Sequence, residues 1–311
     1  MSAGAQKCVA LSSTGETQTY TLQVGTSTQP GRCSIEFVDY AIPEKVISKD
    51  FSYEEVVIVP IGDVHFGAKG FAHRSFMDFR NSVEKEYGDK QIYYLGMGDY
   101  VDAYRATVRK AFLNLAPDDG DAIDDYMYER LDEFYHMMHS TKGKWLGLLG
   151  GNHTWTFRHG GTFETELAKM LDTDYLGDCA DVQMKFSSSG KSRGSVGIWA
   201  HHGVGGRKYP VGKLIDDICP HFPDSDIFLM GHVHLREYRD FIRMRRVGKQ
   251  YVDQVGVAAI TGGWLKGYIE GPSTYVERKA MKPRAVGGLV LKVRPRMVHG
   301  IWAPRIRMET I

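Results

Sequence analysis

The stretch VVIVPIGDVHFG, residues 56–67, joins an apolar run to a polar turn that carries an aspartate and a histidine. The run Val56–Pro60 has no charged residue and stands between Glu55 and Gly62, as expected of a strand that is buried on both faces. The turn that follows presents Asp63 and His65. Because the same arrangement returns along the chain, it decides the fold class.

Four further apolar runs follow the same pattern: Ile92–Gly96, Trp145–Gly150, Val196–Ala200 and Ile227–Met230. Between them, apolar residues are spaced by three and four positions, which predicts helices with one buried face. The predicted helical faces are formed by Phe76, Phe79, Val83 and Tyr87, by Leu167, Met170 and Leu171, and by Val211, Leu214, Ile215 and Ile218. Alternating strands and helices predict an α/β protein whose sheets are covered by helices.

The 311 residues are 42% hydrophobic and 25% charged, which is typical of a soluble globular protein. No apolar run approaches the roughly 20 residues of a membrane span, and no signal peptide is recognisable, so we expect a cytoplasmic protein without membrane contact. Residues 1–50 are rich in small polar residues and are interpreted as an extension, with short strands expected at Thr19–Val24 and Ser34–Val38. Residues 51–311 form the main domain.

The four cysteines, at positions 8, 33, 179 and 219, lack the spacing of a zinc site. In the expected cytoplasmic setting they are predicted to be reduced structural thiols, and a Cys8–Cys33 bridge remains the alternative.

Charge is unevenly distributed although the net charge is only +1. A helical insertion at about 104–144 carries eight acidic residues between Asp118 and Glu133, which indicates either a solvated helix face or a cap or homodimer element beside the site. The part after 235 is basic and β-rich. Six Lys or Arg fall within Arg236–Lys249, and nine fall between Arg278 and Arg307 with no acidic residue.

Polar turns follow all five apolar runs. They contain Asp63 and His65, Asp99 and Asp102, Asn152 and His153, His201 and His202, and His232 and His234. Sites in α/β sheets lie beyond the carboxyl ends of the strands, so these turns should converge. Imidazole, carboxylate and amide oxygen without thiolate suit divalent metals such as Mn, Fe or Zn. Each motif alone is weak, but five in order after five strands indicate one site.

This ordered set, D-x-H, G-D-x-x-D, G-N-H, H and G-H-x-H over residues 63–234, resembles the signature of the calcineurin-like metallophosphoesterases. The resemblance implies a four-layer αββα sandwich, in which two packed mixed β-sheets are flanked by helices. It also implies two divalent metal ions, with manganese favoured and iron or zinc as alternatives.

Carried over to this chain, the resemblance gives one metal to Asp63, His65 and His234. The second metal is assigned to Asn152, His201 and His232, and Asp99 bridges the two. Of the adjacent histidines, His201 is preferred as the ligand because the family's ligand usually comes directly off the strand; His202 is the alternative.

The implied reaction is hydrolysis of a phosphoester by a metal-bridging hydroxide. His153 is expected to face the substrate and to donate a proton to the leaving oxygen. Asp102 is expected either to orient a ligand or His153, or to serve only as a turn or capping carboxylate.

Three departures from this motif pattern narrow the range of expected activities. Thr154 stands where most relatives have an acid after G-N-H. Ala103-Tyr104 replaces the Arg-Gly of the protein Ser/Thr phosphatases after G-D-x-x-D, and the second histidine of the repair nucleases is absent here. A protein phosphatase and an exonuclease of that type are therefore both disfavoured.

Substrate contacts are predicted for Arg158, His159, His202 and Arg207, which lie close to ligands in the sequence. The basic segments Arg236–Lys249 and 278–307 would bind DNA or RNA, with bases stacked on interleaved aromatic residues. These aromatic residues are Trp264, Tyr268, Tyr275 and Trp302. The alternative is a β-hairpin and edge strands kept soluble by Lys and Arg.

The favoured substrate is a nucleotide or nucleic-acid phosphodiester. The alternatives are a phosphomonoesterase that acts on a small metabolite or phosphoprotein and a catalytically inactive binding scaffold. Because every ligand position is filled, the sequence disfavours the scaffold.

Overall fold

The computed structural model describes residues 6–11, 17–22, 46–103, 120–204, 210–271 and 273–311, which divide between two compact units. The smaller unit, Met1–Glu44, contains an antiparallel pair, β1 (Gln6–Leu11) and β2 (Thr17–Leu22). The strand expected at Thr19–Val24 overlaps β2. The strand expected at Ser34–Val38, and Cys33, lie outside the described residues.

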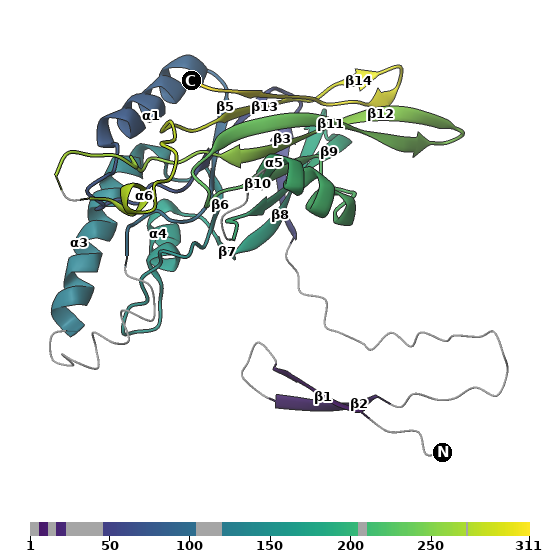
Figure 1. Ribbon diagram of the computed structural model, residues 1–311. Helices are drawn as coiled ribbons and strands as arrows, with labels where there is room; N and C mark the ends of the chain where they lie inside the picture. Colours follow the sequence, from purple (N-terminus) through teal and green to yellow (C-terminus); the bar gives the residue numbers. More distant parts are fainter. Residues whose placement is uncertain (1–5, 12–16, 23–45, 104–119, 205–209, 272) are drawn as a thin grey trace. The chain divides into compact units, whose positions relative to one another are not determined.

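The larger unit, Lys45–Ile311, is built on two six-stranded mixed sheets (Figure 1). In the first sheet, β4 to β7 are parallel, and β13 runs antiparallel to both β4 and β16. Its order is β16 (Arg305–Glu309), β13 (Val290–Arg294), β4 (Val56–Ile61), β5 (Gln91–Gly96), β6 (Trp145–Leu149) and β7 (Tyr175–Gly177).

In the second sheet, β9, β10 and β12 run parallel, and β8 and β11 lie antiparallel to β9 and β12. Its order is β11 (Arg236–Val247), β12 (Gln250–Thr261), β10 (Ile227–Met230), β9 (Lys191–His201), β8 (Cys179–Ser188) and β3 (Val46–Ser52). Because β3 pairs with β8, the larger unit begins before residue 51. All five predicted buried strands are present, shared between the two sheets.

Three apolar cores define four layers. Alternate residues of β4 point to opposite faces, so Val56 and Ile58 join the core between the sheets while Val57 and Val59 join the core under the helices of the first sheet. A third core, which contains Phe228, lies on the outer face of the second sheet. The predicted αββα sandwich is therefore confirmed.

Three helices cover the first sheet: α1 (His73–Tyr87), α3 (Gly120–Met138) and α4 (Phe163–Leu171). From residue 120 onward, the helical insertion expected at about 104–144 contains α3, in which Met127, Leu131 and Phe134 are buried. The short 3-10 turn η2 (His139–Thr141) ends this segment.

The second sheet is covered by α5 (Pro210–Lys213), the π-helical turn η3 (Leu214–Ile218) and the 3-10 turn η4 (Cys219–His221). One regular helix was expected from the spacing of Val211 to Ile218. The observed break is consistent with Gly212 inside α5 and Pro220 after η3, because glycine and proline are the weakest helix formers.

The basic C-terminal part is built of strands, with the short helix α6 (Tyr275–Arg278) and the small pair β14 (Met297–Val298) and β15 (Ile301–Trp302). In Figure 1 the hairpin of β11 and β12 extends from the body of the molecule, and β11 and β16 are edge strands. This agrees with the expected hairpin and edge strands.

Two of the aromatic residues expected to stack on bases are used inside the fold. Trp264 is buried and packs edge-on against Phe76, and Trp302 donates its Nε1 hydrogen to the carbonyl of Ser195. Base stacking by these two side chains is therefore not supported. The side chain of Tyr275 lies outside the described part of the chain.

Two simple properties of the described residues complete the fold. None of their helices has the length and apolarity that crossing a bilayer requires. Cys219 is a buried free thiol.

Candidate metal centre

The polar turns at the strand ends of both sheets converge on one cluster. Three groups of side chains each bring their ligand atoms within 4.8 Å of one another. The groups are Asp63, His65 and His234; His65, Asp99 and His153; and Asp99, His202 and His232. The ends of β4, β5, β6, β9 and β10 thus meet as the sequence predicts.

Five of these residues have left-handed backbone conformations that non-glycine residues rarely adopt. Their φ angles lie between 48° and 68°. They are Asp63, His65, Asp99, His232 and His234. Such strain persists only where the surrounding structure imposes it, and it is concentrated at functional sites.

The first group contains closely opposed donor atoms. The Nε2 atoms of His65 and His234 lie 3.1 Å apart, and Asp63 Oδ1 lies 3.3 Å from His234 Nε2. The carboxylate of Asp63 is fully buried. Its Oδ2 accepts a hydrogen bond from the backbone of His232 at 2.8 Å, while Oδ1 has no hydrogen-bond partner among the described residues. A buried carboxylate oxygen aimed at two imidazoles is suited to a cation.

The group formed by Asp99, His202 and His232 is organised around His202. Its Nδ1 donates to the carbonyl of Met97 at 2.7 Å, which fixes the ring. Its Nε2 then lies 3.1 Å from Asn152 Oδ1 and 3.4 Å from Asp99 Oδ2. A backbone contact of this kind holds a metal-ligating histidine in one tautomer.

His202, and not His201, belongs to this cluster, which differs from the preferred assignment. His201 is the last residue of β9, and the two-residue repeat of a strand places it on the same face as Trp199. The two rings stack with centroids 5.7 Å apart, and His201 Nδ1 accepts a hydrogen bond from the amide of Gly203. The turn after the strand aims the next residue into the site instead.

Asp99 belongs to two of the three groups, the one with His65 and His153 and the one with His202 and His232. Its Oδ2 lies 3.7 Å from His65 Nε2 as well as close to His202, and its Oδ1 accepts the backbone hydrogen of His153 at 2.8 Å. A Cβ atom on Gly151 would stand 2.1 Å from Asp99 Oδ1, so this carboxylate can occupy its position only beside a glycine. The shared position is the one expected of a bridging ligand.

Asp102 stands between two histidines. Its Oδ1 lies 3.2 Å from His153 Nδ1 and 3.6 Å from His65 Nδ1. Burial by itself raises the pKa of Asp102, but its interactions with the nearby rings of His153 and His65 outweigh burial and hold it below its usual range. An ionised Asp102 therefore orients both rings, and the Nε2 atom of His153 points away from it.

The pKa shifts of the cluster reflect burial and the mutual effects of its acids and imidazoles. Burial opposes protonation of His202, but its hydrogen bond with Asp99 raises its pKa to about 9. Burial, together with the nearby Asp99, raises the pKa of Asp63 well above its usual value. Burial and the neighbouring His65 lower the pKa of His234 to about 3, so its ring is neutral at neutral pH. Burial also opposes ionisation of Asp99, but its hydrogen bond with His202 holds its pKa below the usual range. Buried carboxylates and imidazoles fit divalent cations, whose binding would release the proton held between His202 and Asp99.

The predicted substrate-binding residues have mixed positions. His159 is held at both ring nitrogens, 3.2 Å from Tyr128 Oη and 3.2 Å from Glu166 Oε1, so it links helices rather than facing the cluster. Arg158 is exposed, and its backbone donates to Asp124 at 2.8 Å. Arg207 lies outside the described residues.

A buried carboxyl group that the sequence did not reveal supports the G-N-H loop. Glu164, at the start of α4, is 1% exposed and accepts a hydrogen bond from the hydroxyl of Thr154. Burial raises its pKa to about 7. An acid from α4 thus stands beside the position where most relatives of the resembled family carry one in the loop. The sequence feature that could have revealed Glu164 is the capping motif at Thr162, which places Glu164 in the first turn of α4.

Two further contacts were not predicted from the sequence. Asp124, on the acidic helix, is buried and accepts from Trp155 Nε1 at 2.8 Å, so part of that acidic face is structural. Gly263, after β12, approaches the cluster so closely that a Cβ atom there would lie 3.1 Å from both Asp63 and His234. The pair of glycines that follows the apolar end of β12 was the sequence feature that could have predicted this close approach.

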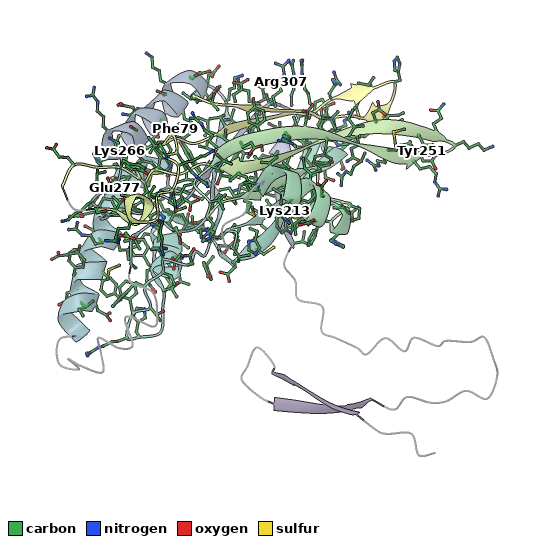
Figure 2. All side chains as sticks on the ribbon, in the orientation of Figure 1. Phe79, Lys213, Tyr251, Lys266, Glu277 and Arg307 are labelled. Atoms are coloured by element: carbon green, nitrogen blue, oxygen red, sulfur yellow. The ribbon has the colours of Figure 1, made fainter. Side chains whose placement is uncertain are left out.

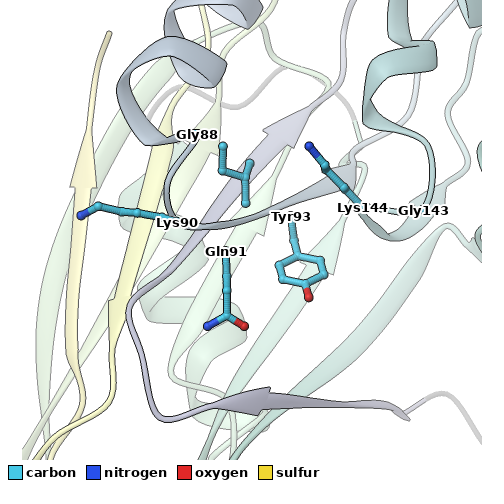
Figure 3. A pocket seen from close by; sticks show the side chains of 7 residues that line it. Gly88, Lys90, Gln91, Tyr93, Gly143 and Lys144 are labelled. Carbon is cyan, nitrogen blue, oxygen red and sulfur yellow. The ribbon is translucent and has the colours of Figure 1, made fainter.

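The distal basic residues of the hairpin lie along a strand that leads away from the cluster. β11 begins two residues after His234, and Arg245 lies nine residues farther along the strand than Arg236. At about 3.3 Å per residue this is roughly 30 Å from the site end. A surface pocket shown in Figure 3, lined by Lys90, Tyr93 and Lys144, opens at the amino ends of β5 and β6, the opposite end of the sheet.

Comparisons with known proteins found distant structural likenesses alone. No protein-family model and no curated protein matches the chain. Among solved structures, Vacuolar Protein Sorting 29 from Cryptosporidium parvum matches with a TM-score of 0.35 and 14% identity, over 83% of this chain and 100% of that one. A conserved protein from Streptococcus pneumoniae, described as a predicted phosphoesterase, matches with a TM-score of 0.30 and 11% identity, over 81% of this chain and 98% of its own.

Proposed function

We propose that this chain is a metal-dependent phosphoester hydrolase with a dinuclear centre. The observation that carries the proposal is the position of Asp99 between two groups of ligand atoms, His65 with Asp63 and His234 on one side and His202 with His232 on the other. Asn152 extends the second group. Held there, two divalent cations would activate water and neutralise charge on the phosphoryl group.

The chain's own residues supply proton transfer. His153 is held by Asp102 at Nδ1, so its Nε2 faces away from that carboxylate and can deliver a proton to the leaving oxygen. A carboxylate bound to Nδ1 also stabilises the protonated ring. Asp102 is therefore a positioning residue, and His153 is the proposed general acid.

A small phosphoester, such as a nucleotide or another small phosphodiester, fits the surroundings better than a polymer. The sequence favoured a nucleotide or nucleic-acid phosphodiester, and the basic segments were the reason for including nucleic acid. Arg243, Arg245 and Arg246, however, lie along a strand that leads away from the cluster. Arg243 also donates to the carbonyl of Ser225 at 2.6 Å, which gives it a structural role. A monoester remains the alternative substrate.

The test combines metal analysis with a substrate panel. Purified protein is loaded with manganese, with iron or zinc as alternatives, and bound metal is counted. Hydrolysis of p-nitrophenyl phosphate, bis-p-nitrophenyl phosphate, cyclic nucleotides and labelled DNA and RNA is then compared. We expect about two cations per chain and loss of activity on chelation. Hydrolysis that survives complete chelation would exclude a metal-dependent mechanism. A chain that binds no divalent metal and hydrolyses none of these substrates would be a binding scaffold.

A further inference from the structure

One face of the β11–β12 hairpin carries large apolar side chains in solvent. Ile242 is 64% exposed and Met244 is 61% exposed. Ile242 lies directly opposite Val255 in the pair, so the two side chains are on the same face. Tyr251, which Figure 2 shows at the far end of the hairpin, lies on this face as well and is 71% exposed.

This face continues the one that forms the core between the two sheets. On β12, Val257 and Ala259 point to the same side as Val255 and are buried in that core. The hairpin extends beyond this part of the core, so the same apolar pattern runs on into solvent. Exposed apolar patches next to polar residues mark contacts with other proteins.

Two charges of β11 on this face are arranged symmetrically about the apolar stripe. Asp240 lies three residues before position 243 and Arg246 three residues after it, with Ile242 and Met244 between them. Neither Asp240 nor Arg246 makes an ion pair within the described part of the chain. On the opposite face of β11, by contrast, Arg239 pairs with Glu237 at 3.2 Å.

We propose that this face is a contact between two copies of the chain related by a two-fold axis. With the two β11 strands antiparallel, Met244 of one copy meets Ile242 of the second, and Arg246 meets Asp240. Each contact then occurs twice, as a two-fold interface requires. Both unpaired charges gain a partner of opposite sign.

The chemistry of the face favours a protein over nucleic acid. Tyr, Met and Arg are the residue types enriched in protein interfaces. Asp240 and Asp253 lie on the same face and would repel phosphates. The inference does not depend on the proposed hydrolase function, since none of these residues belongs to the cluster.

Analytical ultracentrifugation of the full chain over a concentration series tests the contact. We expect a reversible dimer, and the variant Ile242→Ser with Met244→Ser should dissociate at least about 10-fold more readily because apolar burial is lost in both copies. Val46→Ser is the matched control, since Val46 is 62% exposed on β3 at the other edge of the same sheet. It should leave association unchanged. Circular dichroism confirms that all variants are folded.

A charge exchange tests the relative orientation of the copies. Arg246→Asp and Asp240→Arg should each weaken the dimer, because like charges then face each other. The double variant with both substitutions should restore it.

A chain that stays monomeric at every concentration would overturn the proposal, as would equal dimerisation of the serine double variant and the Val46 control. Failure of the double charge variant to recover would exclude the antiparallel arrangement. Binding of a labelled oligonucleotide that depends on Arg246, by a monomeric chain, would assign the face to nucleic acid instead.

Discussion

The metal-centre cluster and the β11–β12 hairpin both hold many polar residues, and one strand joins them. His234 stands just before β11, while Arg246 stands near its other end. At the cluster, polar side chains are buried, contact one another and have left-handed backbones. On the hairpin, charged side chains are exposed on regular strands. A high local density of charge therefore drew attention to the hairpin as a possible binding surface. A metal site is distinguished from such a surface by the position of the backbone and by the contacts among its side chains.

Asp99→Asn should produce the largest effect. Asp99 belongs to two of the three ligand groups, one with His65 and one with His202, and a neutral amide cannot balance two cations. Both metals should weaken together and activity should fall by at least ~10³-fold. Metal content and rate on the best substrate of the panel measure this. Asp240→Asn on the hairpin is the control, and loss of only one metal would contradict a shared role for Asp99.

His153→Ala separates proton transfer from metal binding. We expect both cations to stay and the rate to fall by about 10²–10⁴-fold, as for loss of a general acid. A substrate with a good leaving group, which needs no proton, should lose less. Because His153 also lies within reach of His65 and Asp99, an emptied metal site in this variant would identify it as a ligand.

Alanine substitutions of the neighbours His201 and His202 form a matched pair, and the expected loss of activity is smaller than for Asp99→Asn. His202→Ala should weaken one cation and reduce the rate by about 10²-fold, because the ring near Asn152 and Asp99 is removed. His201→Ala removes a ring stacked on Trp199 and should retain both metals. Metal stoichiometry decides between them, and the reverse result would restore the assignment favoured by sequence.

Glu164→Gln tests the buried carboxyl group beside the cluster. Burial raises its pKa from 4.5 to about 7, so between these values the folded chain binds more protons than the unfolded chain. Stability contributed by this group is therefore lost as pH rises through this window. In chelator, the Gln variant should gain stability over the parent chain by on the order of 1–3 kcal/mol on moving from about pH 5 to about pH 8.

Urea unfolding of both chains at the two pH values measures this difference. Glu166→Gln is the control: a hydrogen bond with Lys169 lowers the pKa of Glu166, so its carboxylate is ionised at both values and no comparable change is expected. A difference for Glu164→Gln that is independent of pH would show that Glu164 does not titrate in this window.

Arg245→Ala should have the smallest effect on catalysis. Arg245 is on the hairpin, roughly 30 Å along β11 from the site end, and on the face opposite Ile242. Activity on small esters should change by less than about 2-fold, and dimerisation should change little. A large loss of activity on a small substrate would show that the hairpin closes over the cluster.

Much of the fold could be predicted because its signals are local. Val56–Pro60 and the four other apolar runs predict buried strands, and the polar turns after them predict one converging site. Each inference depends only on neighbouring residues, since strand burial and turn chemistry are properties of a short segment. The resemblance added the two-sheet sandwich, which no single segment reveals.

The choice between His201 and His202 could not be made in this way. It depends on which residue ends the strand and on which face Trp199 packs. The hydrogen bond from Thr154 to Glu164 could not be predicted either, because it joins two segments that come into contact only when α4 packs.

By itself, the sequence determined which side chains could meet a cation, because the ligand types and their glycine-bounded turns are written in order along the chain. The tertiary structure alone decided which of them point inward, which carboxylate is shared, and that the arginines of β11 lead away from the site. Those outcomes follow from strand direction and side-chain alternation in sheets whose neighbours come from distant parts of the chain.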